Sequence, residues 1–74
     1  MPARGNKYAR LIQAHLVDAY GQQFWDIVYM LQDSPGEPRT GRIGFESSYD
    51  DPRPGDWVII SFIAGQPAGL YKTD

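Results

Sequence analysis

The fold class of this chain is decided by the stretch Arg53-Pro54-Gly55-Asp56-Trp57-Val58-Ile59-Ile60-Ser61-Phe62-Ile63. A proline followed by a glycine predicts a turn, because proline presets its φ angle and glycine accepts a positive one. The β-branched and aromatic residues that follow are typical of a strand with a buried face. We therefore predict a central strand over residues 56–63, with the rings of Trp57 and Phe62 in the hydrophobic core.

The length and composition limit how large that core can be. The chain has 74 residues, enough for one domain, and contains no cysteine and one histidine. Disulfides and thiolate metal sites are therefore excluded, and one histidine cannot build a zinc site. Because so small a domain is marginally stable alone, dense aromatic packing and oligomerisation are the two means of stabilisation that remain.

The beginning of the chain admits two interpretations. Residues 1–6 combine proline, glycine and charge, and predict a flexible N-terminal arm. Residues 7–20 have apolar side chains at helical spacing, yet they also fit a strand that leads into a hairpin turn over residues 20–23. We favour the strand, because every later segment is β-like and a sheet needs partners. The alternative is an α+β fold in which residues 7–20 are helical.

Three further segments have the pattern of strands. Residues 24–32 are apolar on both faces, whereas residues 40–46 alternate, with Arg42 on the polar side and Ile43 and Phe45 on the apolar side. Prolines and glycines punctuate the intervening loops and predict a turn over residues 64–69. The last predicted strand is short, over residues 70–72.

Taken together, the predicted strands and turns indicate a mainly β domain over residues 7–74. A sheet this small has open edges that invite aggregation, and closure into a barrel removes them. The segment Pro54-Gly55-Asp56-Trp57-Val58 resembles strand openings in small β-barrels of the SH3-like or OB type. We therefore expect a small five-stranded antiparallel barrel, SH3-like or OB-like.

The sequence offers weak candidates for chemistry. His15 with Asp18 or Asp26 could form a general base with an orienting carboxylate, but we expect a structural histidine. An acidic group could attract a hard cation, but it lacks an EF-hand pattern and is expected to be a solvated loop; its members are Glu46, Asp50, Asp51 and Asp56. No phosphate-binding glycine motif is present. We therefore predict no enzymatic activity, no cofactor, no metal and no small-molecule substrate.

Arginine interleaved with aromatic residues is the most informative constellation for function. Such surfaces mark protein interfaces, and they also bind single-stranded nucleic acid on small barrels. The predicted binding residues are Arg39, Arg42, Tyr49 and Tyr71. We expect docking onto a protein partner or onto a second copy, through this patch or through a sheet edge. The formal net charge of −2 places nucleic acid second.

Two further expectations complete the sequence-based prediction. If the arginine patch is not the binding surface, the next candidates are the face between Tyr8 and Tyr20 and the edge at Tyr71. No apolar run of signal-peptide or membrane-spanning length is present, which predicts a cytoplasmic protein without membrane contact.

Overall fold

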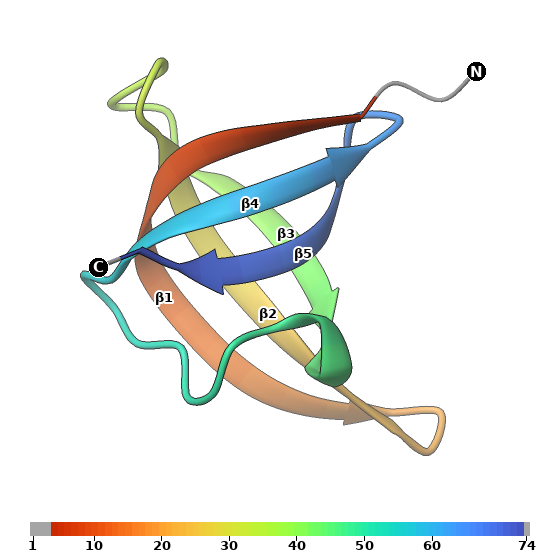
Figure 1. The fold of residues 1–74 in the computed structure, drawn as a ribbon. Helices are drawn as coiled ribbons and strands as arrows, with labels where there is room; N and C mark the ends of the chain where they lie inside the picture. The colour runs from red at the N-terminus through yellow and green to blue at the C-terminus, as the bar shows by residue number, and fades with distance from the viewer. Residues whose placement is uncertain (1–3, 74) are drawn as a thin grey trace.

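The computed structural model describes residues 4–73 and contains one antiparallel sheet (Figure 1). The elements are β1 (Arg4–Ala19), β2 (Gln22–Leu31), β3 (Arg39–Gly44), the short 3-10 helix η1 (Phe45–Ser47), β4 (Trp57–Ile63) and β5 (Gln66–Lys72). The strand order is β3-β2-β1-β4-β5. Three consecutive strands with a fourth returning beside the first form a Greek key, to which β5 is added as a hairpin. The predicted mainly β fold is confirmed.

The long first strand confirms the strand prediction for residues 7–20 and excludes the helical alternative. Its first half, Arg4–Arg10, pairs with β4, and its second half, from Ala9 onwards, pairs with β2. In Figure 1 the first half runs beside β4 and the second half turns away towards β2. A register shift between Leu11 and Gln13 leaves one extra residue, Ile12, at this bend, as in a β-bulge.

Two tight hairpins connect neighbouring strands. Tyr20 and Gly21 join β1 to β2 with φ angles of 53° and 75°, and Ala64 and Gly65 join β4 to β5 with φ angles of 52° and 79°. Two consecutive positive φ angles are the signature of a type I′ turn, whose twist matches that of the strands. The predicted hairpin turn over residues 20–23 is confirmed at Tyr20 and Gly21, whereas Gln22 and Gln23 already belong to β2.

The expected closed barrel is wrong in one respect, because the sheet ends at β3 and β5 without joining them. The two edge strands approach through side chains: a Cβ on Gly41 would lie 2.9 Å from Cγ of Pro67. Pro67 has no amide hydrogen to donate to a ladder. Further along β5, Leu70 instead bridges to Ser48, and its carbonyl accepts a hydrogen bond from the Tyr49 amide at 3.1 Å. These contacts occupy the edge that a closed barrel would pair.

The sheet wraps around one hydrophobic core. Its fully buried members are Ala9, Leu11, Ile27, Tyr29, Leu31, Ile43, Val58, Ile60 and Leu70. Phe62 is half-buried against this core, with its ring centroid 6.4 Å from that of Tyr29. Trp57, however, is 52% exposed, so the prediction that it is a core residue is wrong. Val58 and Ile60 take the inner face of β4, and alternation turns Trp57 outwards.

Three predicted boundaries also differ. Residues 4–6 of the predicted arm belong to β1, because backbone pairing with β4 needs no apolar side chain; residues 1–3 lie outside the described residues. Strand β5 begins at Gln66, so the predicted turn over residues 64–69 shrinks to two residues. Phe45 leaves the alternating strand for η1 and is 46% exposed rather than core-facing.

Truncation at neighbouring positions of β4 tests this assignment of faces. We expect Ile60→Ala to lower the free energy of unfolding by about 2–5 kcal/mol, because it leaves a cavity in the core. Trp57→Ala should cost about 1 kcal/mol or less, because the ring is half exposed. Urea denaturation in dilute solution measures both, and equal losses for the two variants would contradict the assignment.

Candidate functional site

The candidate site lies on the outer face of β1, β4 and β5. In an antiparallel ladder, residues directly opposite each other project to the same face. Tyr8 pairs with Ile59, and Ile59 pairs with Tyr71, so the three side chains form one row across three strands. Tyr8 is 57% exposed and Tyr71 is 54% exposed, with the half-buried Ile59 between them.

The next row along the strands contains Arg10 and Trp57, which are also directly opposite. The Arg10 guanidinium carbon lies 5.4 Å from the centroid of the Trp57 ring, within the range of a cation–π interaction. We call the surface formed by the two rows the outer aromatic face; it consists of Tyr8, Arg10, Trp57, Ile59 and Tyr71. Contiguous exposed apolar side chains are a recognised mark of interaction sites, which makes the outer aromatic face the candidate site.

The sequence places these side chains outside because their neighbours are fixed inside. Ala9, Val58, Ile60 and Leu70 are completely buried. Successive residues of a strand point to opposite faces, so the residues flanking these four must project outwards. Burial of these four residues therefore decides which side chains form the outer aromatic face.

The predicted arginine patch does not assemble. Arg39 lies opposite Tyr29, a core residue, whereas Arg42 lies opposite Asp26, so the two arginines leave β3 on opposite faces. Arg42 is exposed, as predicted, but it is engaged by Asp26: its Nε and Nη2 donate hydrogen bonds of 2.7 and 3.0 Å to the two carboxylate oxygens. These bonds lower the pKa of Asp26 and raise the pKa of Arg42. Arg39 lies 3.9 Å from Glu37.

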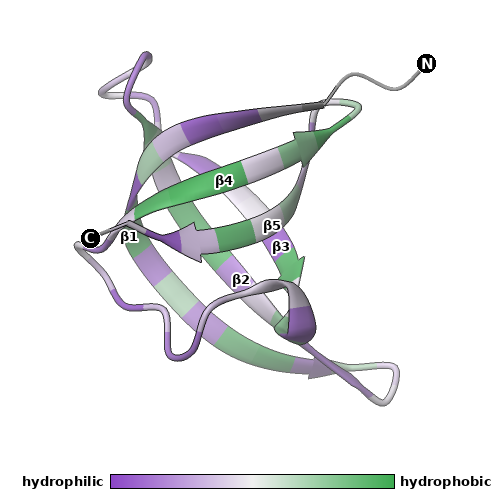
Figure 2. Cartoon of the chain, in the orientation of Figure 1, coloured by the Kyte–Doolittle hydropathy of each residue, from purple (hydrophilic) through white to green (hydrophobic). Residues whose placement is uncertain are grey.

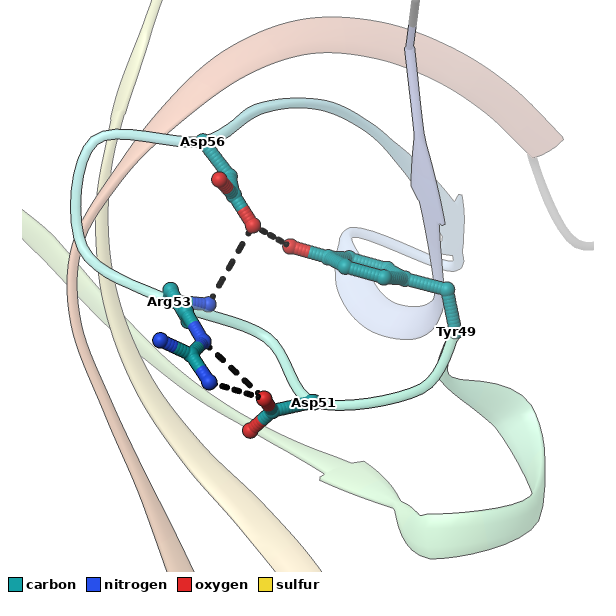
Figure 3. A network of polar contacts seen from close by, with 4 residues as sticks. All are labelled: Tyr49, Asp51, Arg53 and Asp56. Carbon is teal, nitrogen blue, oxygen red and sulfur yellow. Dashed lines mark hydrogen bonds and ion pairs between the residues drawn. The ribbon is translucent and has the colours of Figure 1, made fainter.

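Tyr49 is not part of an exposed patch either, because it is half-buried against the core. Figure 3 shows the polar network that it joins. Its hydroxyl donates a 2.6 Å hydrogen bond to Oδ2 of Asp56, which also accepts the Arg53 amide at 3.3 Å. The Arg53 guanidinium in turn donates to Asp51 at 2.7 and 2.9 Å. Burial, followed by the bond to Asp56, raises the pKa of Tyr49, and this bond lowers the pKa of Asp56. The network fixes the loop that precedes β4.

Of the four predicted binding residues, Tyr71 alone lies on the outer aromatic face. Tyr8 and Tyr71, which the sequence suggested as separate second candidates, lie in one row. Sequence reasoning missed Trp57, Ile59 and Arg10. Positions 57–60 are aromatic or aliphatic, so their pattern contains no contrast that could show which two face outwards. Most of β4 is accordingly green in Figure 2.

The remaining chemical candidates form a different surface. His15 and Asp26 are directly opposite on β1 and β2, and Arg42 is opposite Asp26 on β3. The Asp26 carboxylate is thus held by Arg42, whose hydrogen bonds and positive charge favour its ionised form. Within residues 4–73, no group of three or more histidine, aspartate or glutamate side chains could hold a metal ion.

Comparison with known proteins gives no relative from which to transfer a function. No protein-family model matches the chain, no curated protein matches it, and no solved structure matches it. In the part of the chain that the structure describes, no helix is long and apolar enough to span a membrane.

The Tyr49–Asp56 hydrogen bond should be visible in the pH dependence of stability. A carboxylate whose pKa is lowered in the folded state stabilises that state above its unfolded pKa of 3.8, and this contribution is lost as the pH falls through the lowered value. We expect Tyr49→Phe to cost about 1 kcal/mol at neutral pH, and less in acid, where Asp56 is protonated.

Urea denaturation at about pH 7 and about pH 3 measures this difference. Tyr20→Phe is the matched control, because it removes the hydroxyl of a tyrosine that is 99% exposed. A Tyr49→Phe variant with the same acid sensitivity as the wild-type protein would show that the bond does not contribute to stability.

Proposed function

We propose that this protein is a non-enzymatic binding module that docks onto a protein partner through the outer aromatic face. The observation that carries this proposal is the row formed by Tyr8, Ile59 and Tyr71 beside the Arg10–Trp57 pair. Tyrosine, tryptophan and arginine are the residues most enriched at the energetic centres of protein interfaces. Rigid rings on a sheet also lose little conformational entropy when a partner covers them.

The outer aromatic face supports docking better than the sheet edge does. A partner strand needs a row of free amides and carbonyls. Along β5 that row is interrupted by Pro67, and the Leu70 carbonyl already accepts the Tyr49 amide. We therefore assign docking to side chains on the outer face.

Single-stranded nucleic acid is the second candidate, and the Arg10–Trp57 pair favours it. Bases stack on exposed rings beside basic side chains, and OB folds are five-stranded, partly open Greek-key barrels that bind oligonucleotides. Against this candidate stands the net charge of −2, because phosphate binding grows with the number of charges neutralised. Arg42 and Lys7 are moreover paired with Asp26 and Asp33.

Site-specific photo-crosslinking in cells tests the proposal. A benzophenone amino acid replaces Tyr71 on the outer aromatic face or, as the control, Tyr20 in the β1–β2 turn, where the side chain is 99% exposed. We expect position 71 to give a discrete protein adduct that position 20 does not give and that survives nuclease treatment. Mass spectrometry identifies the adduct.

Two results would contradict docking of a protein on this face. Equal labelling at positions 71 and 20 would mean that the outer aromatic face has no preferred partner. An adduct that nuclease removes would assign the face to nucleic acid instead. The yield of that adduct in vitro should also fall steeply when the salt concentration is raised before irradiation, whereas an adduct that forms by docking of apolar side chains should not depend on salt in this way.

A further inference from the structure

The outer aromatic face has an approximate two-fold pattern. Ile59 is at its centre on β4, with Tyr8 one strand away on β1 and Tyr71 one strand away on β5. Neighbouring strands are about 4.8 Å apart, so the backbone positions of Tyr8 and Tyr71 stand at similar distances on either side of Ile59. The Tyr71 ring leans along β5, because a Cβ on Gly69 would lie 2.9 Å from the Tyr71 hydroxyl. The two tyrosines are also nearly equally exposed, at 57% and 54%. A 180° rotation about an axis along β4 therefore places each tyrosine position of one copy opposite the other tyrosine position of a second copy.

We propose that the partner docked on the outer aromatic face is a second copy of this chain, packed face to face about a two-fold axis along β4. The inference rests on the proposed function, because it names the partner of the same surface. A two-fold interface brings the same patch of both copies together. With this axis, Tyr8 of each copy lies against Tyr71 of the other, and Ile59 and Trp57 each lie against their own counterparts.

The distribution of apolar side chains selects this axis. The alternative is a two-fold axis perpendicular to the strands, along the row of Tyr8, Ile59 and Tyr71. That axis would bring the residue two positions before Ile59 in one copy against the residue two positions after it in the other, so Trp57 would lie against Ser61. An axis along β4 sets each of the four large apolar side chains against another apolar side chain. Two sheets that pack face to face in this way keep their strands within about 30° of each other.

The position of the charged side chain on the outer aromatic face is compatible with a second copy as the partner. Arg10 is the charged member of the outer aromatic face, and its guanidinium already lies over the Trp57 ring of its own chain. The two copies of Arg10 in the dimer lie on opposite sides of the axis, so no like charges meet at the centre. Three acidic side chains outside this face are paired within the chain: Asp26 with Arg42, Asp33 with Lys7 and Asp51 with Arg53.

The available area predicts a weak dimer. A standard interface takes about 800 Å² from each partner, roughly a sixth of the 5127 Å² accessible surface of this chain. Three strands of about seven residues span roughly 14 Å by 23 Å, which supplies less than that area. We therefore expect dissociation in the micromolar range. A domain of 74 residues without cysteine gains stability from such a contact.

A charge-exchange experiment tests both the face and the axis. Sedimentation equilibrium is measured for the wild-type protein, for Tyr8→Asp, for Tyr71→Lys and for an equimolar mixture of the two variants. We expect each variant alone to dimerise at least about tenfold more weakly than the wild-type protein. The mixture should associate about tenfold more tightly than either variant alone, because the introduced aspartate meets the introduced lysine at one contact and two native tyrosines meet at the other. Tyr20→Asp, in the β1–β2 turn, should dimerise like wild type.

Tryptophan fluorescence gives a readout that does not depend on the charged variants. Trp25→Phe leaves Trp57 as the single tryptophan, because the chain has two. On dilution, its emission should shift to longer wavelength with the midpoint found by sedimentation, as Trp57 becomes exposed to water. Circular dichroism confirms that each variant is folded.

Three outcomes would overturn the inference. They are a wild-type protein that is monomeric up to about 1 mM, a dimer that both charged variants leave unchanged, and a mixture that does not recover association. A monomeric protein that still cross-links to another protein through position 71 overturns the second copy but leaves the proposed function standing. Absence of both the dimer and the position-71 adduct overturns both.

Discussion

The bend of β1 is the constraint on which the rest of the structure depends. This strand has 16 residues, and its two halves belong to two differently oriented parts of one sheet. At the bend, the Leu11 amide donates to the Asp56 carbonyl at 2.9 Å, and the Leu11 carbonyl accepts the Gly55 amide at 2.7 Å. The turn before β4 is thereby attached to the point where β1 changes partner. The two inner faces can then enclose one core.

This attachment decides which alternate residues of β4 face the core. Ala9, beside the bend, is buried and pairs with Val58, so Val58 and every second residue after it enter the core. A shift of one residue would exchange the faces of the whole strand and expose Val58 and Ile60. The outward orientation of Trp57 and Ile59 is the necessary counterpart of that burial, so the register that builds the core also decides which residues form the outer aromatic face.

The two halves of the outer surface differ in chemistry. Over β1, β2 and β3, a polar row of His15, Asp26 and Arg42 carries the Asp26–Arg42 ion pair, and the Arg42 guanidinium also lies 5.4 Å from the centroid of the Phe24 ring. Over β1, β4 and β5, the opposed side chains are aromatic and aliphatic. We base the proposal of a partner surface on this row of aromatic and aliphatic side chains over three strands, more than on the presence of any one aromatic residue.

The sequence by itself determined the features that depend on neighbouring residues. Gly55 in the Pro54-Gly55 turn has a φ of 91°, and the alternation of Arg42 and Ile43 gives one exposed and one buried side chain, both as expected from local pattern. The strand character of residues 7–20 was also predictable, from the β-like segments around it. Tertiary structure alone decided which face of β4 is buried, because an all-apolar run has no contrast and register depends on a partner strand far away in sequence. For the same reason, only the folded sheet could bring Tyr8, Trp57 and Tyr71 onto one surface, separate Arg39 from Arg42 and draw Tyr49 inwards.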